Sequence, residues 1–550
     1  MTSISEILAL KKASFSSSSS SFSSSSFSSS SSHNTEMQGK GKEKKEQFSL
    51  SIILDEDQQS AVQLAKAGKS FCLIGKAGTG KTTSEREIVK AILQNCTSSH
   101  VFRIQGMGQS ADGPGIAVLA YTRIAAGNSK KAIFKEAYLE EVMPFNITTI
   151  HNFLEFQPEF YYDEATEKDK MRFVPKRGPF NPVTTTTIII EEASMVDMVL
   201  AQKLYLAIAG KTQLIFIGDI NQLPPPFGIS IFNHALRQLP IVELKTVYRQ
   251  EEGSIILENA HNILEGRKIK EDKDFKIIRL GDVQHGQEIT SFKIAKAFKI
   301  LFEKGEYDPE QDIILTPLNV QPLGSDNMNS HIAQMLGSQR NALIHHIIAG
   351  IRQLYLAVGD SVRVQKIQGV IKNIKRNPKY WGRVPKHSIG LDRFGHHHTA
   401  LTSLEEEESE QEIAEFSLEN DVEDEDLTHQ ASHVVTVELE TGEIVELSKT
   451  GELSAANFSL GYCLTFYKSQ GCEWRNVFII MHKDQSIQIF NEALYTAVTR
   501  AKQKVMIFAK DWLIDKAIAT RRIKGSSLKD KLEWFNEKLS NEDEFTVSPW

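Results

Sequence analysis

The chain has 550 residues, of which 41% are hydrophobic and 24% are charged, and its formal net charge is −7. This length and composition predict a multidomain globular protein and exclude a wholly disordered one. No apolar run approaches the roughly 18 residues of a membrane-spanning helix, and the four cysteines form no C-x-x-C pair. A membrane role, a zinc site and a disulfide framework are therefore not expected.

Residues 1–47 consist of a serine-dominated stretch followed by a spacer rich in lysine and glutamate. Such a composition cannot bury enough apolar surface to fold, and we interpret it as a disordered tail. An organelle-targeting peptide is the alternative, although the tail has no arginine and carries Glu6 early. Without such targeting, we expect a cytoplasmic or nucleoid-associated protein.

Strands alternate with helices from Phe48 onward, which predicts an α/β fold with parallel sheets. Strand-like runs at 71–74, 117–120, 187–190 and 214–217 predict one doubly wound domain, and those at 312–316, 477–480 and 504–508 a second. Residues 434–447 alternate about a Thr-Gly-Glu turn and predict a β-hairpin in a small β-rich insertion. The predicted division is a tail at 1–47, a first domain at 48–250, a second domain at 251–360 and 455–515, an insertion at 361–454 and a C-terminal helical extension at 516–550.

A glycine-rich loop follows the first strand, in the sequence LIGKAGTGKTT at residues 73–83. It matches G-x-x-x-x-G-K-[ST] completely, with a strand before it and a helix after it. In such a loop the backbone N–H groups close around phosphates, Lys81 reaches the β and γ phosphates, and the Thr82 hydroxyl binds Mg²⁺. The candidate nucleotide-binding residues are Gly75, Lys76, Ala77, Gly78, Thr79, Gly80, Lys81, Thr82 and Thr83.

Two carboxylates end the buried strand in the sequence IIIEEASM at residues 188–195. In P-loop ATPases the first such carboxylate holds Mg²⁺ and the second polarises the attacking water, which suits Glu191 and Glu192. Two glutamates after a strand would otherwise be an ordinary exposed strand end. The glycine-rich loop upstream favours the catalytic interpretation.

Further segments complete a recognisable series: LDEDQQSAV, LAYTRIAAGN, TIHNFL, FIGDINQLPPP, VYRQ, YKSQG and YTAVTRAK. Together with the glycine-rich loop and the paired carboxylates, they occur in the order of the superfamily 1 helicases, and the chain resembles the RecD and phage Dda group. The resemblance covers about residues 48–510, less the insertion. It implies two RecA-like P-loop NTPase domains that use ATP and Mg²⁺ to move 5′ to 3′ along single-stranded DNA.

The resemblance also implies roles around the nucleotide. Gln58, or the adjacent Gln59, would contact the adenine edge, while Asp219 and Gln222 would sense the γ phosphate. Arg249 and Arg500 would reach the γ phosphate from the second domain, where a guanidinium stabilises transition-state charge.

Strand contacts are implied at turns that offer hydroxyls, amides and cations to backbone phosphates. Tyr467 stands where relatives usually have histidine, so stacking on a base is expected there. The candidate strand-contacting residues are Thr122, Arg123, Thr149, His151, Lys468, Ser469 and Gln470.

Residues 154–183 contain two aromatic-rich runs around a charged turn. In Dda-like helicases a β-hairpin at this place is the pin that separates the strands, and Phe160, Tyr161 and Phe173 are the candidate wedge. An ordinary hairpin whose aromatics fill a satellite core is the alternative.

Two charged stretches lie in the insertion. Residues 361–391 carry eight lysines and arginines and no acid, with Tyr380 and Trp381 among them, which suits single-strand binding. Residues 405–426 carry 13 acidic residues and no basic one, so the rest of the chain is net positive. A solvated basic face neutralised by this acidic loop is the equal alternative.

We therefore expect a monomeric, ATP- and Mg²⁺-dependent DNA helicase for replication, repair or recombination. Its expected partners are single-stranded and forked DNA, with single-strand-binding or replication proteins as candidates and no membrane. The alternatives are an RNA helicase, a motor of opposite polarity, and a single-strand-binding ATPase that displaces proteins without unwinding.

Overall fold

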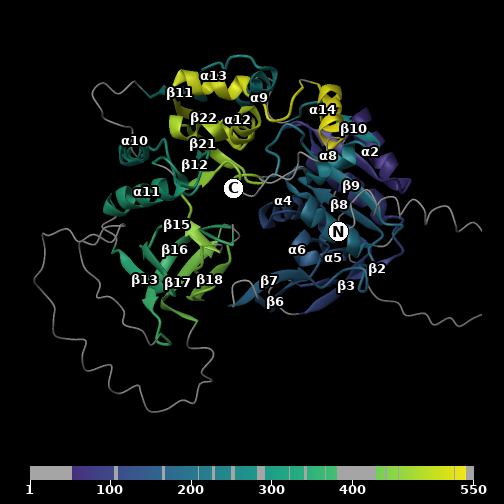
Figure 1. The fold of residues 1–550 in the computed structure, drawn as a ribbon, viewed down its shortest axis with the longest axis horizontal. Helices are drawn as coiled ribbons and strands as arrows, with labels where there is room; N and C mark the ends of the chain where they lie inside the picture. The colour runs from purple at the N-terminus through teal and green to yellow at the C-terminus, as the bar shows by residue number, and fades with distance from the viewer. Residues whose placement is uncertain are drawn as a thin grey trace, which may run out of the picture.

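The computed structural model describes residues 53–540, apart from 105–108, 164–167, 209, 226–229, 249–253, 281–290, 321, 340–342, 366, 381–428, 440–441, 456 and 526. The serine-rich tail, the acidic run at 405–426, Arg249 and Trp381 therefore lie outside the described residues. Within them, the chain forms two α/β domains side by side and a separate β unit (Figure 1). The predicted α/β class with two parallel sheets is confirmed.

The first domain is built on a six-stranded, all-parallel sheet in the order β10-β1-β9-β8-β4-β5. Its central strands are mostly apolar and almost entirely buried, as expected for strands covered on both faces. The strands are β1 (Phe71–Gly75), β4 (Ile116–Ala120), β5 (Ile147–Thr149), β8 (Thr187–Glu191), β9 (Gln213–Gly218) and β10 (Ile241–Leu244).

Helices cover both faces of this sheet, and each face has its own hydrophobic core. One core contains residues of α2, α3, α4 and α5, and the other contains residues of α6, α7 and α8. The helices are α2 (Glu56–Lys66), α3 (Lys81–Leu93), α4 (Arg123–Ile133), α5 (Ala137–Val142), α6 (Ile150–Phe153), α7 (Met198–Ala207) and α8 (Ile231–Leu236), with a 3₁₀ turn η1 at Ala193–Met195.

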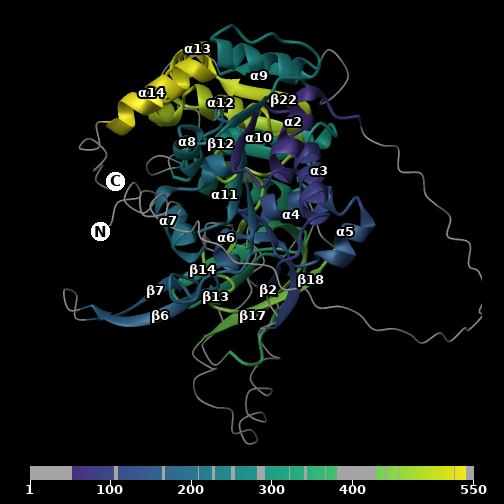
Figure 2. The ribbon, with the colours of Figure 1, turned by 90° about the vertical axis from the view of Figure 1, so that its right-hand side faces the viewer.

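Two antiparallel hairpins extend from the first domain. One pairs β2 (Ser99–Arg103) with β3 (Ser110–Pro114), and the other pairs β6 (Phe156–Asp163) with β7 (Lys168–Pro175). Figure 2 shows the β6–β7 hairpin projecting away from the body of the domain. It lies where the sequence predicts the pin.

The second domain has a five-stranded parallel sheet in the order β11-β22-β21-β12-β20. Its strands are β11 (Phe275–Arg279), β12 (Ile313–Thr316), β20 (Cys463–Thr465), β21 (Trp474–Ile480) and β22 (Ala501–Ala509). Its helices are α9 (Ile255–Glu265), α10 (Ser291–Glu303), α11 (Ser325–Gln339), α12 (Asn491–Val498) and α13 (Asp511–Ala519), with a 3₁₀ segment η2 at Lys483–Gln488. The last described helix is α14 (Leu528–Ser540).

The β unit, residues 345–460, has its own hydrophobic core. Its main sheet is antiparallel, in the order β18-β17-β16-β15-β19, with the pair β13-β14 packed beside it. The strands are β13 (His345–Ala349), β14 (Arg352–Leu356), β15 (Ser361–Val364), β16 (Ile367–Arg376), β17 (Gln430–Leu439), β18 (Ile444–Lys449) and β19 (Phe458–Leu460).

Three predicted domain boundaries differ from those in the structure. The β unit extends beyond the predicted 361–454, because Ile347 and Leu356 on one side and Phe458 on the other belong to its core. The predicted end of the second domain at 515 cuts through α13, whose Ala517 and Ile518 still pack in that domain's core. Short strands at the edge of an insertion look the same in sequence as strands of the host domain.

No helix in the described part of the chain combines the length and the apolar character needed to cross a membrane.

Candidate ATP site and strand-binding surface

The glycine-rich loop leaves β1 at Gly75 and enters α3 at Lys81. Gly78 and Gly80 have φ angles of 84° and 80°, a left-handed conformation that glycine adopts without steric cost. The Lys81 ammonium donates to the carbonyl oxygens of Gly75, at 2.7 Å, and Lys76, at 3.0 Å. The N-terminus of α3 carries no side-chain cap, so its backbone N–H groups are available to a phosphate.

Gln58, rather than Gln59, faces the glycine-rich loop. The Gln58 side chain is buried, and its amide nitrogen lies 2.8 Å from the place that a Cβ on Gly80 would take. Its Oε1 also accepts from the N–H of Asp55 in a capping box at the start of α2. Gln59 is exposed. Of the two glutamines that the sequence offers for the adenine edge, these positions favour Gln58.

Tyr248 is a residue of this site that the sequence analysis missed. Its backbone N–H donates to the carbonyl of Gly78, at 2.7 Å, and its hydroxyl donates to Asp55 Oδ2, at 2.8 Å. The half-exposed ring stands next to Gly80. It lies one residue before Arg249 in the VYRQ segment, and that adjacency is the signal that could have found it.

The two carboxylates at the end of β8 form a desolvated pair. Glu191 Oε2 and Glu192 Oε2 are shielded from water and have no hydrogen-bond partner within the described residues. Burial raises the pKa of both groups, and the charges of Glu85 and Glu192 raise the pKa of Glu191 further. Glu192 also has a φ of 50°, a strained conformation for a residue with a Cβ.

A divalent cation fits this carboxylate pair. Orphaned carboxylate oxygens beside the glycine-rich loop need a positive charge to offset their burial. The described residues contain no group of three or more His, Cys, Asp or Glu side chains arranged to hold a metal by themselves. Mg²⁺ instead takes one or two protein ligands together with phosphate oxygens and water. Thr82 and Glu191 would hold it, and it would supply charge neutralisation at the phosphates.

Glu85 is a second residue that the sequence analysis missed. It lies one turn after Lys81 on α3, is fully buried, and accepts from Ser129 Oγ at 3.3 Å. Burial raises the pKa of Glu85 to about 8. A glutamate on the apolar stripe of α3 is the sequence signal that could have found it.

Arg500 of the second domain affects Glu192 through its charge. Its buried guanidinium donates to the carbonyls of Thr496, at 3.1 Å, and Cys472, at 3.3 Å. Burial raises the pKa of Glu192, and the Arg500 charge is the largest effect that offsets this rise. The guanidinium and the carboxylate are thus close enough to interact across the two domains.

Replacing Arg500 by alanine is expected to slow ATP hydrolysis by about a hundredfold while leaving ATP binding nearly unchanged, because its charge matters most in the transition state. Single-turnover hydrolysis and nucleotide titration measure the two effects. Lys504→Ala is the control, since Lys504 is an exposed cation on β22, the strand that begins directly after Arg500. A change in ATP affinity alone would show that Arg500 is structural.

The GDINQLPPP loop connects the two domains. Asp219 Oδ1 accepts from the backbone N–H and the side-chain amide of Asn221, both at 2.9 Å, and Gln222 is buried beside them. The backbone of Leu223 is bonded on both sides by the second domain: its N–H donates to Thr496 Oγ1 at 3.0 Å, and its carbonyl accepts from Gln470 at 2.9 Å. Movement of the second domain would therefore shift this loop.

Thr122 and Thr149 begin the helices α4 and α6. Each hydroxyl accepts a backbone N–H as a helix cap, from Ala125 at 3.1 Å and from Asn152 at 3.2 Å. Both threonines are largely buried, so in this arrangement their hydroxyls stabilise the helix N-termini. Arg123 is exposed in the first turn of α4.

His151 packs against aromatic rings, with ring centroids 4.9 Å from Phe156 and 6.2 Å from Tyr121. It therefore connects α6 to the first residue of the β6–β7 hairpin.

Three of the predicted strand-contacting residues in the YKSQG segment are occupied by contacts within the protein. Ser469 is fully buried and donates to the carbonyl of Phe466, while Gln470 is buried against Leu223. Tyr467 packs on the second domain's core, and its hydroxyl accepts from Arg522 at 3.3 Å instead of presenting a ring for stacking. Lys468 is exposed and donates to Asn319 Oδ1, so it is the side chain of this segment that can reach a phosphate.

Comparisons with known proteins agree with this site. Residues 58–228 match the family model described as an AAA domain, and residues 460–508 match the UvrD-like helicase C-terminal domain. The ATP-dependent RecD2 DNA helicase of Deinococcus radiodurans is 24% identical over 82% of this chain and 48% of its own length. The RecBCD enzyme subunit RecD of Buchnera aphidicola subsp. Acyrthosiphon pisum is 32% identical over 30% of this chain and 25% of its own length.

The chain is therefore similar to RecD-like helicases.

This RecD-like chain spans about half the length of RecD2 and a quarter of the Buchnera RecD subunit. Among solved structures, it is similar to Bacteroides Pif1 bound to ssDNA, with 15% identity, a TM-score of 0.45 and coverage of 90% of this chain and 98% of that one. It is also similar to the Pif1 helicase from Candida albicans, with 16% identity, a TM-score of 0.43 and coverage of 89% and 100%.

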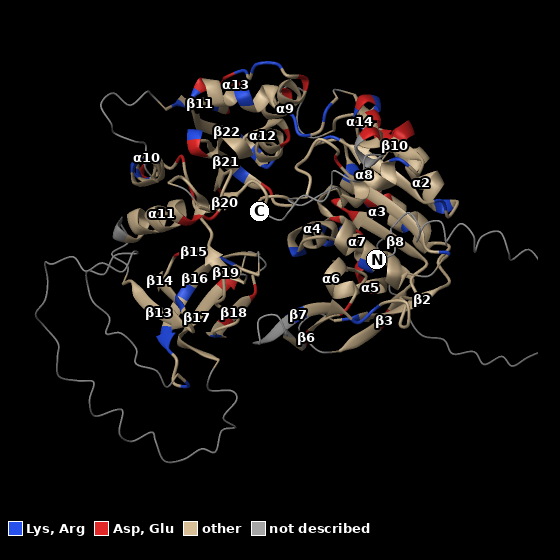
Figure 3. Cartoon of the chain, viewed as in Figure 1, with Lys and Arg blue, Asp and Glu red and all other residues tan. Residues whose placement is uncertain are grey.

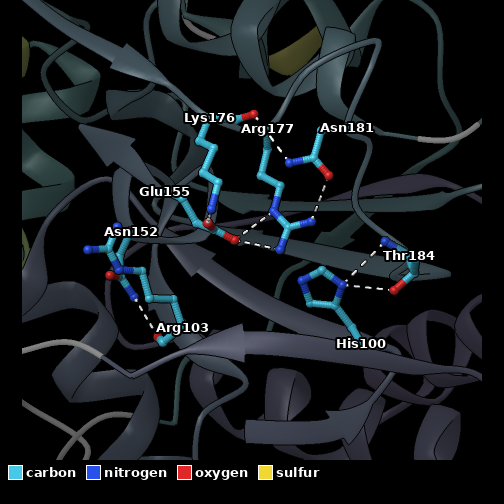
Figure 4. Close-up of polar contacts among 8 residues, drawn as sticks. All are labelled: His100, Arg103, Asn152, Glu155, Lys176, Arg177, Asn181 and Thr184. Carbon is cyan, nitrogen blue, oxygen red and sulfur yellow. Dashed lines mark hydrogen bonds and ion pairs between the residues drawn. The ribbon is translucent and has the colours of Figure 1, made fainter. Parts of the chain in front are cut away.

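The β6–β7 hairpin of this RecD-like chain is fixed at its base by an ion pair. Glu155, directly before β6, is largely buried and accepts from Arg177 Nη2, at 2.5 Å, and Lys176 Nζ, at 3.5 Å, directly after β7. Arg177 also donates to Asn181 Oδ1 (Figure 4). A buried pair that bridges the two ends of a hairpin restrains its direction relative to α6.

The pairing register of β6 with β7 places the predicted wedge residues on two different faces of the hairpin. Phe173 pairs with Pro158 and Tyr161 pairs with Lys170, so Phe173 and Tyr161 lie on opposite faces. Tyr162, which the prediction omitted, shares the face of Phe173, and the two rings are 60% and 57% exposed. The side chain of Phe160 lies outside the described residues. The exposed rings do not fill a satellite core.

Part of the predicted basic stretch lies on strand β16. Lys372, Lys375 and Arg376 are exposed there, and Figure 3 shows basic positions along the lower part of the β unit. Arg363 differs, because it is buried and donates to the carbonyl of Lys468. Lys372 pairs with Glu438 at 2.6 Å, so this surface is partly neutralised from within the β unit.

Proposed function

We propose that this chain is an ATP- and Mg²⁺-dependent DNA helicase that moves 5′ to 3′ along single-stranded DNA and unwinds forked duplexes. ATP hydrolysis would supply the work, and the two domains would convert it into movement along a strand.

One observation carries this proposal: the candidate ATP site is shared between the domains. Lys81, Glu191 and Glu192 come from the first domain, and Arg500 comes from the second and acts on Glu192. A site of this kind is complete only when the domains are together. Nucleotide binding and hydrolysis would therefore open and close the domain interface, which is the elementary step of a motor.

The strand-facing side supports a nucleic-acid track. The N-terminus of α4 meets Gly471 of the second domain, where Asn128 Nδ2 donates to the Gly471 carbonyl at 2.6 Å. A change at the domain interface would thus move α4 relative to Lys468. The capped N-termini of α4 and α6 would contact phosphates, with affinity that falls as salt rises.

A strand-displacement assay tests the substrate and the polarity together. The protein is incubated with ATP, Mg²⁺ and DNA duplexes carrying a 5′ or a 3′ single-stranded tail, and with the matching RNA duplexes. Displacement of the 5′-tailed DNA alone is the expected result. Displacement from a 3′ tail or of RNA would overturn the polarity or the substrate. Strand-stimulated ATPase without any displacement would favour an ATPase that strips proteins from the strand.

A further inference from the structure

The helix α14 follows the second domain in sequence but packs on the first domain. Leu528 and Leu532 contact the hydrophobic core that contains α8, and Figure 1 shows α14 beside α8 while α13 stays with the second domain. Arg237 of the first domain donates to Asn536 at 2.6 Å. This helix lies outside both segments that the family models match.

A lysine on α14 is buried against the GDINQLPPP loop. Lys531 is 5% exposed, and its ammonium donates to Asn221 Oδ1 at 2.5 Å. Burial lowers the pKa of Lys531 to about 8. Glu492 and Asp219 favour its charged form, while Arg521 and Lys76 oppose it. Since burying an ammonium is costly, its placement depends on the acceptor and the acidic charges around it.

Hydrogen bonds continue from Lys531 to the glycine-rich loop. Asn221 Nδ2 donates to Asp219 Oδ1 at 2.9 Å, and the hydroxyl of Tyr495 donates to Asp219 Oδ2 at 2.7 Å. The backbone N–H of Ala77 then donates to the Tyr495 hydroxyl at 3.1 Å. The series joins α14, the first domain's loop and the second domain's α12 to the phosphate-binding backbone.

A bound nucleotide would compete with the last of these bonds. The N–H groups of such a loop close around phosphates, so a bound phosphate and the Tyr495 hydroxyl compete for the Ala77 N–H. If phosphate takes the Ala77 N–H, the Tyr495 hydroxyl loses that donor, and its hydrogen bond to Asp219 would change. Because Asn221 accepts from the ammonium of Lys531 and is itself bonded to Asp219, the environment of α14 would depend on whether phosphate is bound.

We propose that Lys531 is a positioning residue for ATP turnover, which makes the C-terminal helix part of the ATP site. Lys531 acts through Asn221 and Asp219, which it holds in the arrangement that places Tyr495 against the glycine-rich loop. This inference rests on the proposed function, because it assumes that the loop binds ATP.

The first test compares Lys531→Met with Lys529→Met, an exposed lysine on the same helix. Lys531→Met should lower kcat of strand-stimulated ATP hydrolysis by about tenfold, the value of one lost charged hydrogen bond, with KM nearly unchanged. Lys529→Met should match the wild type. Methionine fills the space of a buried lysine stem, so the melting temperature should hold. Wild-type kcat in Lys531→Met, or a lower melting temperature with normal turnover per folded molecule, would overturn the proposal.

The second test does not depend on turnover. Amide hydrogen exchange of α14 is measured with and without ADP and aluminium fluoride, in the wild type and in Tyr495→Phe. Nucleotide should change the exchange rate of α14 in the wild type but not in Tyr495→Phe, which lacks the connecting hydroxyl. An α14 that does not respond in the wild type, despite nucleotide binding measured on the same sample, would overturn the inference. A wild type that neither binds nor hydrolyses nucleotide would instead contradict the proposed function.

Discussion

Lys81→Ala is expected to abolish ATP turnover, a loss of at least about 10²- to 10³-fold, while single-stranded DNA binding is kept. The ammonium of Lys81 is already held inside the glycine-rich loop by the carbonyls of Gly75 and Lys76. Phosphate oxygens would replace those carbonyls as its partners, so alanine removes the cation that neutralises the β and γ phosphates. The strand-facing surface at α4 and Lys468 is not touched.

Lys69→Ala is the matched control, because Lys69 is an exposed lysine just before β1, the strand that leads into the glycine-rich loop. ATPase rate and the affinity for a labelled single strand are measured on both variants and on the wild type. Hydrolysis by Lys81→Ala within a few-fold of the wild type would rule out the phosphate role of the loop. Parallel loss of strand binding would indicate misfolding, which melting curves would detect.

Replacing Phe160, Tyr161 and Phe173 together by alanine is expected to eliminate duplex unwinding and to leave strand-stimulated ATPase largely intact. Phosphate contacts carry the motor along one strand, whereas an aromatic ring at the junction offsets the stacking that a separated base loses. That stacking is worth about 1–3 kcal/mol per base, or about tenfold in rate for each ring. Unwinding, ATPase and melting temperature are measured on one preparation.

The two faces of the hairpin can be separated within the same experiment. If one face of the hairpin separates the duplex, the unwinding rate of the double variant Tyr162→Ala, Phe173→Ala should differ strongly from that of Tyr161→Ala. Glu159→Gln is the control, since it breaks an exposed pair with Arg172 that contributes about 0–1 kcal/mol. Loss of unwinding, ATPase and thermal stability together in the triple variant would refute the wedge.

Four of the six strands of the first parallel sheet, three of the five strands of the second and the glycine-rich loop could be predicted because their signals are local. An apolar run such as that of β1 is buried whatever its neighbours are, and the positive φ angles of Gly78 and Gly80 follow from residue type. The carboxylates of Glu191 and Glu192 follow from their place at the end of a buried strand. These features depend on residues within one turn or one strand.

The remaining features depend on residues that lie far apart in sequence. Gln470 is buried because Leu223, from the other domain, offers it a carbonyl, and no local pattern reports that pairing. Tyr495 contacts Ala77 across the same interface. The docking of α14 on the first domain and the edges of the β unit likewise follow from tertiary packing, which overrides local periodicity.

The most direct measurement of the central claim is single-turnover strand displacement from a 5′-tailed DNA fork by the wild type, with ATP and Mg²⁺, in parallel with Lys81→Ala. The wild type is expected to displace the strand with ATP but not with a non-hydrolysable ATP analogue, and Lys81→Ala is expected to displace none although it still binds the fork. Displacement without hydrolysis, or equal displacement by Lys81→Ala, would contradict this claim.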